Sequence, residues 1–327
     1  MRPSKKRSSA FLTALLCAVA LIMVACGGGG TANPPAATHT KAAQSQQIYI
    51  SDAEAGTADI STFDPQITTD ALSAYAIDNV FTGLVQLGDD LKVHPQLASS
   101  WTISPDNLTY TFTLRPNLMF SDGTPLTSAD VVYSMDRALQ PATQSGTAPY
   151  YMRYIKDASK LAAGSIKTII GDSLLAPDPN TVVVKAASPV AFFLDSLTYP
   201  TSYVVEKSVT TKWGKAWTDH LADNGGQGGD GPFKVQEYTH SKQIVFVPNP
   251  NYYGPKPQLQ KVVFPFYKST DTGYPAYLVD QLDKTPIPTA DLATARTRAD
   301  FHNAPFLAIN YYTMNYLQKP FDVTSCR

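Results

Sequence analysis

Residues 97–139 read LASSWTISPDNLTYTFTLRPNLMFSDGTPLTSADVVYSMDRAL, and this stretch decides the fold. Within 108–114, large apolar side chains alternate with threonines, which is the period of two expected of a strand with one buried face. Thr127 and Asp130 stand three positions apart before apolar residues at helical spacing, which is the pattern of a capping box. The stretch therefore predicts a strand, a turn at 121–123 and a helix that begins after Thr127.

Further helix and strand signals lie on both sides of this stretch. Asp70 precedes apolar residues at helical spacing, so we expect it to cap a helix. Short apolar and β-branched runs predict strands at 48–50, 181–185, 243–247 and 261–267. Because Pro265 cannot donate a ladder hydrogen bond, the last of these is expected to be an edge or bulged strand. Short strands and scattered helices together favour an α/β fold with mixed sheets.

The first thirty residues predict export. Four positive charges among the first seven residues precede an uncharged apolar run at 10–24, and Cys26 is followed by four glycines. This order is typical of a secretory signal peptide. The cysteine at the predicted cut resembles a bacterial lipobox, although Met23 stands where leucine is more usual. The resemblance implies that Cys26 is lipidated, and that the chain is tethered to the outer face of a membrane. A transmembrane anchor is the alternative, but the run of about 15 residues is shorter than the roughly 20 that a spanning helix needs.

Composition excludes several other classes of protein. The chain has 327 residues and a formal net charge of −1, and removal of the four positive charges of the signal leaves −5. A mildly acidic body argues against nucleic-acid binding, which depends on clustered Lys and Arg. Of three cysteines, Cys17 lies in the signal and Cys26 is the lipid site, so only Cys326 remains and no intramolecular disulfide is expected.

The motifs along the chain resemble one family throughout. Besides residues 97–139, they comprise TFDP at 62–65, DNVFTGL at 78–84, GDGPFKV at 229–235, PNPNYYG at 248–254, QLD at 281–283 and NYLQKPFD at 315–322. In this order they closely resemble family 5 solute-binding proteins, the oligopeptide- and dipeptide-type receptors of bacterial ABC importers. Most of these blocks are expected to be scaffold, with the turn at 121–123, the cap at Thr127 and packing by Trp101 and Tyr110.

The resemblance implies a periplasmic-binding-protein-like fold of type II, in which mixed sheets with flanking helices form two lobes that close over the ligand. Domains I and II build one lobe and domain III builds the other. The predicted segments are a signal peptide (1–25), a flexible tether (26–47), domain I (48–81 and 191–308), domain II (82–190) and the start of domain III (309–327).

The resemblance also implies where a peptide binds. In the family, the segment after the Asp-Pro pair contacts the ligand, and by ungapped count it falls on Thr69, Asp70 and Ala71. A Pro-Tyr pair after the signature helix also reaches the ligand and matches Pro149 and Tyr150. Two alternatives stay open. Asp70 can be a helix cap that makes no ligand contact, and Tyr150 can be a core residue. In the second case, Tyr151 and Tyr154 are the competing candidates.

The chain departs from the family after 321–322. There the family continues with a Val-Arg pair and about two hundred further residues, whereas this chain reads VTSCR and stops. We therefore expect only the lobe of domains I and II, with a strand at 309–314 leading into the missing one. A cleft with a single wall buries little of a ligand. We expect peptide to bind this chain weakly or not at all, and micromolar binding in calorimetry would contradict that expectation.

Taken together, the sequence predicts a lipid-anchored substrate-binding protein of a peptide-type ABC importer. Its expected partners are a peptide ligand, a permease with its ATPase subunits, and the membrane through Cys26, with no nucleic acid. We expect a monomer without a cofactor, located on the outer face of the cytoplasmic membrane or in the periplasm. A receptor for oligosaccharide, nickel or haem on the same scaffold is the alternative. An exported hydrolase is remote, because the chain has no Gly-x-Ser-x-Gly elbow and no His-Glu-x-x-His motif.

Overall fold

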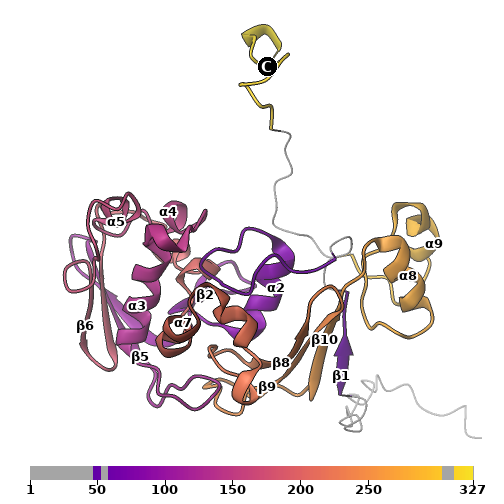
Figure 1. Ribbon diagram of the computed structural model, residues 1–327, viewed down its shortest axis with the longest axis horizontal. Coiled ribbons are helices and arrows are strands. Elements are labelled where there is room, and N and C mark those ends of the chain that lie inside the picture. The colour runs from indigo at the N-terminus through magenta and orange to yellow at the C-terminus, as the bar shows by residue number, and fades with distance from the viewer. Residues whose placement is uncertain (1–46, 53–57, 304–312, 327) are drawn as a thin grey trace, which may run out of the picture. The chain divides into compact units, whose positions relative to one another are not determined.

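The computed structural model of the chain describes residues 47–52, 58–303 and 313–326 (Figure 1). Within these residues, the strands form two four-stranded sheets and one two-stranded ribbon, β2-β3. Sheet A has the order β1-β10-β9-β8, and sheet B has the order β4-β5-β7-β6. The mixture of sheets and helices confirms the predicted α/β class.

The elements have the following bounds. The strands are β1 (Ile48–Ile50), β2 (Val85–Leu87), β3 (Val93–Pro95), β4 (Ala98–Ile103), β5 (Thr109–Leu114), β6 (Leu174–Asp178), β7 (Thr181–Lys185), β8 (Phe233–Thr239), β9 (Gln243–Pro248) and β10 (Lys261–Pro265). The α-helices are α2 (Ala71–Val80), α3 (Ser128–Leu139), α4 (Ala148–Tyr151), α5 (Ala158–Ala162), α6 (Phe193–Ser196), α7 (Lys207–Trp213), α8 (Thr270–Leu278) and α9 (Leu292–Ala295). The 3₁₀ helices are η2 (Pro141–Thr143), η3 (Pro200–Ser202), η4 (Gly214–His220), η5 (Asp223–Gly225), η6 (Thr289–Asp291) and η7 (Thr324–Cys326).

Several predicted features lie outside the described residues. They are the signal peptide at 1–25, the lipid site at Cys26, nearly all of the tether and most of the strand expected at 309–314. In the part of the chain that the structure describes, no helix has the length and apolar character needed to cross a bilayer.

Sheet B contains the strand with alternating side chains. Every neighbouring pair in it is antiparallel. Tyr110, Phe112 and Leu114 of β5 are buried, whereas Thr113 is exposed, which confirms the predicted period of two. Trp101 of β4 is partly buried against this core, with its ring centroid 6.4 Å from that of Phe112.

Helix α3 packs against sheet B, in the position visible in Figure 1. At its start, the Thr127 N–H donates to the Asp130 carboxylate at 2.9 Å and the Thr127 hydroxyl donates to the same oxygen at 3.0 Å. The predicted capping box is therefore confirmed, with Asp in the place of the commoner Glu. The buried apolar face of the helix is formed by Val131, Val132, Met135, Ala138 and Leu139.

Sheet A corrects one prediction. Strand β10 pairs with β1 on one side and β9 on the other, without a bulge, so the expected edge or bulged strand at 261–267 is wrong. The reason lies at the end of β1, whose last pair joins Ile50 to Val263. The Phe266 N–H donates to the Lys242 carbonyl of the β9 side, so the Pro265 nitrogen faces the β1 side, beyond the end of that strand. The missing N–H of Pro265 therefore removes no ladder hydrogen bond.

Each sheet has its own hydrophobic core. The core of sheet B draws on residues between 84 and 204, with Leu97, Phe112, Phe120 and Met135 among its fully buried members. The core of sheet A draws on 60–81 and 203–264, with Phe63, Phe81, Trp217 and Phe246 fully buried. The bounds predicted for domains I and II stay a prediction.

The carboxylate of Asp64 connects these two cores. It accepts two hydrogen bonds from the Arg137 guanidinium of α3, at 3.1 and 2.7 Å, and one from the Trp217 indole N–H of η4 at 3.0 Å. The Gln66 N–H donates to it as well, at 3.0 Å. Only 6% of the Asp64 side chain is exposed, so this charge depends on its partners rather than on water.

The block at 229–231 packs against the end of α2. The Gly231 N–H donates to the Val80 carbonyl at 2.8 Å, and a Cβ on Gly229 would lie only 2.3 Å from that same oxygen. Between the glycines, the buried Asp230 carboxyl accepts from the Thr82 N–H at 2.9 Å and from the Thr82 hydroxyl at 2.5 Å. This block is therefore scaffold, as predicted. Burial raises the pKa of Asp230 to about 7, although both hydrogen bonds from Thr82 act in the opposite direction.

Replacement of Arg137 should destabilise the fold strongly. We expect Arg137→Met to lower the free energy of unfolding by about 3 kcal/mol, because it leaves the buried Asp64 carboxylate without its cation. Urea denaturation measures the change, and Arg296→Met, at an exposed position, is the matched control. Equal unfolding free energies for the two variants would show that the Asp64 cluster does not hold the cores together.

Asp230 should make stability depend on pH. Its carboxyl holds a proton up to about pH 7 in the folded chain but loses it near pH 4 when unfolded, so the native state binds more protons between these values. Stability contributed by this group is therefore present below pH 4 and is lost as the pH rises toward 7.

Asp230→Asn should remove this loss, so the variant should gain stability relative to the unsubstituted chain between pH 4 and 7. Urea denaturation across this pH range measures the difference. Asp219→Asn, at an exposed position, should keep the original pH slope. Parallel pH profiles for Asp230→Asn and the unsubstituted chain would contradict the prediction.

Candidate ligand-binding site

The first predicted site segment is the N-terminus of α2. Asp70 is its N-cap and accepts from the Ser73 N–H at 2.8 Å, while the Ser61 hydroxyl donates to the other carboxylate oxygen. Burial acts to raise the pKa of Asp70, but the hydrogen bonds from Ser61 and Ser73 outweigh it and the pKa is lowered, so the carboxylate is charged at neutral pH. Thr69 and Ala71 are exposed on either side of it. The cap predicted at Asp70 is confirmed, and its contact with a ligand stays a prediction.

The second predicted segment is α4. Tyr150 is 61% exposed, so it is not a core residue. Its ring meets that of Tyr151 edge to face, with centroids 5.1 Å apart. Tyr150 therefore presents an aromatic face to solvent, as a ligand contact must, and its role in binding stays a prediction.

The two segments lie side by side although they are about 80 positions apart in the sequence. The Thr147 hydroxyl, just before α4, donates to the Thr68 carbonyl at 3.4 Å. A Cβ on Gly146 would lie 3.9 Å from the Thr69 methyl carbon. The turn before α4 is thus in contact with the turn before α2, and Thr69 and Tyr150 belong to one region of the surface.

Tyr199 is a neighbour that the sequence did not indicate. Its ring stacks on that of Tyr151, with centroids 3.8 Å apart and planes 11° from parallel. Burial raises the pKa of Tyr199, and interactions with Tyr151 and the Asp70 carboxylate raise it further, so its hydroxyl stays protonated at neutral pH. The only local signal is Pro200, which starts η3, and nothing in the sequence shows that this turn meets both α2 and α4.

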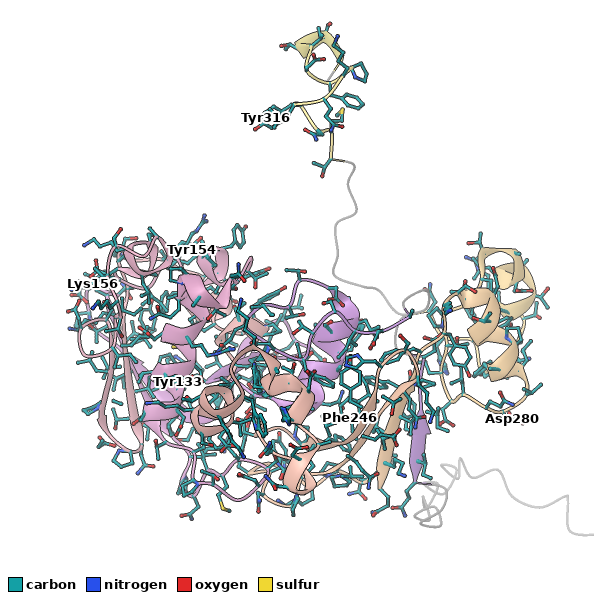
Figure 2. The ribbon with its side chains drawn as sticks, in the orientation of Figure 1. Tyr133, Tyr154, Lys156, Phe246, Asp280 and Tyr316 are labelled. Atoms are coloured by element: carbon teal, nitrogen blue, oxygen red, sulfur yellow. The ribbon has the colours of Figure 1, made fainter. Side chains whose placement is uncertain are left out.

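The aromatic contacts continue beyond α4. We use the name aromatic row for Tyr199, Tyr151, Tyr150, Tyr154 and Phe192. Arg153 is held between two of them, with its guanidinium carbon 5.1 Å from the centroid of the Tyr150 ring and 4.9 Å from that of Tyr154. Tyr154, labelled in Figure 2, meets Phe192 edge to face at 5.3 Å. The row therefore runs from the start of η3 past α4 to the start of α6, and the competing candidates Tyr151 and Tyr154 are both part of it.

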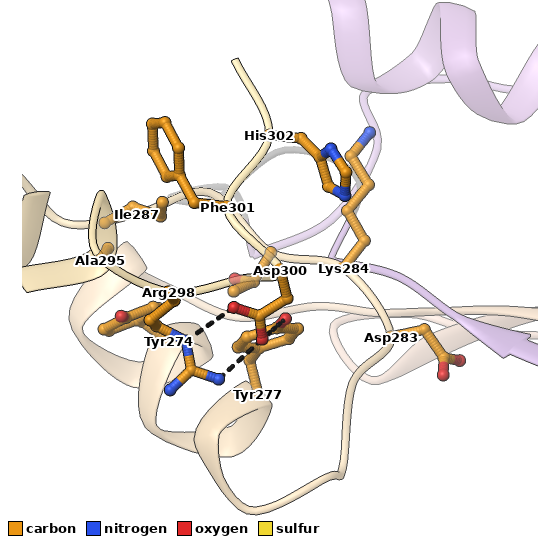
Figure 3. A pocket seen from close by; sticks show the side chains of 11 residues that line it. Tyr274, Tyr277, Asp283, Lys284, Ile287, Ala295, Arg298, Asp300, Phe301 and His302 are labelled. Atoms are coloured by element: carbon orange, nitrogen blue, oxygen red, sulfur yellow. Dashed lines mark hydrogen bonds and ion pairs between the residues drawn. The ribbon is translucent and has the colours of Figure 1, made fainter. Parts of the chain in front are cut away.

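Two hollows lie among other residues. One, of about 230 Å³, is lined by Tyr274, Tyr277, Arg298 and Asp300 among others, and Figure 3 shows it from close by. Arg298 donates twice to Asp300, at 2.9 and 2.7 Å, and Tyr277 donates to Asp300 once at 2.7 Å, so the charges of Arg298 and Asp300 already satisfy each other. The other hollow, of about 540 Å³, lies beside α3, with Arg137 and Lys215 in its lining. None of the four predicted ligand-contact residues lines either hollow.

The described residues include no group of three His, Cys, Asp or Glu side chains that could hold a metal ion. Three histidines each face a single carboxylate: His94 with Asp90 at 2.7 Å, His220 with Asp223 at 2.8 Å, and His240 with Asp59 at 2.9 Å. Isolated pairs of this kind lack the ligand number of a structural or catalytic metal centre. The nickel alternative therefore has no donor set in this part of the chain.

Comparison with known sequences gives relatives that are named as binding proteins. The chain is 29% identical to the dipeptide-binding protein DppE of Bacillus subtilis over 91% of this chain and 54% of that protein. It is 27% identical to the oligopeptide-binding protein OppA of the same organism over 99% of this chain and 58% of that protein. The chain thus spans about half the length of the relatives it matches.

Solved structures show the same likeness. A periplasmic oligopeptide-binding protein of Borrelia burgdorferi superposes with a TM-score of 0.72 and 26% identity, over 84% of this chain and 54% of that one. Haemophilus influenzae OppA in complex with the peptide RPPGFSPFR gives a TM-score of 0.67 and 25% identity, over 76% and 48% of the two chains. These neighbours confirm the predicted type of fold.

A direct comparison with the family gives the same answer as the sequence motifs and the structural neighbours. Residues 92–327 match the description "bacterial extracellular solute-binding proteins, family 5 middle". The chain therefore belongs to family 5 of the bacterial extracellular solute-binding proteins.

Proposed function

We propose that this chain captures extracellular peptides as part of a substrate-binding lipoprotein of an ABC importer. The observation that carries the proposal is the contact between the turn before α2 and the turn before α4. The first turn leads to Thr69, Asp70 and Ala71, and the second leads to Tyr150. These four residues are the positions at which the family resemblance implies ligand contacts. Two of the relatives are named as dipeptide- and oligopeptide-binding proteins, which agrees with this ligand class.

The chemistry of the region suits an extended peptide. The charged Asp70 carboxylate provides a partner for a peptide amine, and the first turn of a helix carries backbone N–H groups that have no acceptor within the helix. Tyr150 offers a ring for an apolar side chain and a hydroxyl for the peptide backbone. A grip on the backbone leaves the ligand side chains loosely specified, as in binding by strand addition.

The wider assignment follows from the same proposal. Lipidation at Cys26 would anchor the chain to the outer face of the membrane, where a permease and its ATPase subunits receive the ligand. Binding by lobe closure needs no chemistry from the chain itself, so we propose a monomeric receptor rather than an enzyme. A receptor for oligosaccharide on the same scaffold is the alternative, and direct titration separates the two.

The titration compares peptide with sugar. The probes are pentaalanine, RPPGFSPFR and maltotriose, added to the 327-residue chain and followed by nuclear magnetic resonance, which measures millimolar as well as micromolar dissociation constants. We expect at least one peptide to bind at least tenfold more tightly than maltotriose. Tighter binding of maltotriose, or no shift with either peptide, would overturn the proposal.

Tyr150 should be a direct ligand contact. We expect Tyr150→Ala to weaken peptide binding about tenfold, because an aromatic contact of this kind contributes about 1 kcal/mol or more. The free energy of unfolding should fall by no more than about 1–2 kcal/mol, because most of this side chain is exposed and only its ring contacts with Tyr151 and Arg153 are lost. Tyr316→Ala, at a tyrosine with the nearly equal exposed fraction of 60%, is the matched control. Unchanged peptide affinity in Tyr150→Ala would remove this residue from the site.

Two substitutions at Asp70 separate its two roles. Asp70→Asn keeps a side-chain acceptor for the Ser73 N–H, so stability should stay nearly unchanged, whereas Asp70→Ala should cost about 1 kcal/mol of unfolding free energy. If the charge binds the peptide amine, both variants should bind pentaalanine more weakly. Urea denaturation and the same titration give the two readouts. Full affinity in Asp70→Asn would show that Asp70 is a cap alone.

A further inference from the structure

The fixed position of Arg153 distinguishes it from a typical exposed arginine. Its guanidinium lies between the rings of Tyr150 and Tyr154, and its Nη2 donates to the Tyr154 hydroxyl at 2.7 Å. Each stacking contact stabilises the exposed cation, and together with the hydrogen bond they hold the planar group in one orientation. A guanidinium held in this way has already lost much of the conformational freedom that ligand binding would otherwise remove.

The guanidinium also lacks an anion. In the part of the chain that the structure describes, Arg153 makes no ion pair, and Tyr154 is its only hydrogen-bond acceptor. Two other arginines have carboxylates of their own, since Arg137 pairs with Asp64 and Arg298 pairs with Asp300.

The two carboxylates that follow Arg153 most closely in the sequence are already engaged with lysines. Asp157 pairs with Lys160 at 2.7 Å, and Asp172 pairs with Lys156 at 3.0 Å. Four N–H donors of the Arg153 fork therefore remain for a partner from outside the described chain.

The surroundings of Arg153 place it at the ligand site. Along the aromatic row, Tyr199 stacks on Tyr151, and Tyr151 meets Tyr150, whose ring is in contact with the guanidinium. The turn that leads to Tyr150 contacts the turn that leads to Asp70. The Asp70 carboxylate and the Arg153 guanidinium therefore belong to one region of the surface. A ligand lying on these rings meets opposite charges at the two positions, which suits a molecule that itself carries both signs.

We propose that Arg153 is a specificity-determining residue that binds a carboxylate of the ligand, with the rings of Tyr150 and Tyr154 holding its guanidinium in place. The inference rests on the proposed peptide-binding function. A carboxylate is the planar group that matches the two parallel donors of a guanidinium. It can come from the C-terminus of the peptide or from an acidic side chain, and the experiment distinguishes these two sources.

The test uses two pairs of synthetic peptides that differ only in one carboxylate. The first pair is pentaalanine as free acid and as C-terminal amide. The second pair is Ala-Ala-Glu-Ala-Ala and Ala-Ala-Gln-Ala-Ala, both as C-terminal amides. Each is titrated by nuclear magnetic resonance into the 327-residue chain and into Arg153→Gln, Arg153→Lys and Arg296→Gln, the last being an exposed control outside the aromatic row.

We expect the unsubstituted chain to prefer the carboxylate-bearing member of at least one pair by about tenfold. The preference should vanish in Arg153→Gln, shrink in Arg153→Lys, which keeps the charge but loses the fork, and persist in Arg296→Gln. A preference within the first pair identifies the C-terminus as the source, and a preference within the second identifies a side chain.

Two results overturn the inference alone: peptides bind without preference in either pair, or the preference survives Arg153→Gln. Failure of all four peptides to bind the unsubstituted chain contradicts the proposed function, and the inference fails with it. Since Arg153 is exposed, its variants should lose only its contacts with Tyr150 and Tyr154 and should remain folded, which urea denaturation checks, so a loss of preference reports on binding.

Discussion

The buried carboxylate of Asp64 is the interaction on which the arrangement of the two cores depends. Its partners come from α3, which belongs to the core of sheet B, and from η4, which belongs to the core of sheet A. A charge buried to this degree is tolerated only with its hydrogen-bonding capacity filled, so the partners must return to the same geometry whenever the chain folds. The segment that carries Asp64 leads within six residues to the cap of α2. The position of one half of the candidate site is therefore fixed by the same carboxylate.

The candidate site is assembled from short turns supported by this frame. Helix α4 has four residues and η3 has three, so neither is stable alone, and both depend on packing against α3. What the turns contribute is exposed chemistry: a charged carboxylate, a series of tyrosine rings and a guanidinium. This division between a rigid scaffold and functional loops is common among binding proteins, because buried elements have little freedom to vary and exposed turns have more.

The sequence predicted most of the scaffold and only part of the site. Alternation at 108–114 and the capping box at Thr127 were sufficient because both signals are local, with period and cap contained in a few residues. The edge position expected for 261–267 was wrong because it depended on where β1 ends, which is information from more than 200 positions away. Tyr199 was missed for the same reason, since its stacking on Tyr151 is a tertiary contact without a local pattern. Arg153 gave no signal, because an arginine between tyrosines in sequence need not lie between their rings in space.

The parallel pairing of β1 with β10 has a consequence for the order of events during synthesis. Sheet B is built entirely from residues between 98 and 185, so its strands are all available once that stretch has left the ribosome. Strand β1 emerges earlier than any of them, yet its partner lies more than 200 positions later, and non-local pairs form late because the intervening chain must first be closed into a loop. The earliest described strand is thus among the last to be paired. Strand β1 has only three residues. Before it pairs with β10, it therefore gives neighbouring chains only a very short edge on which to add a strand.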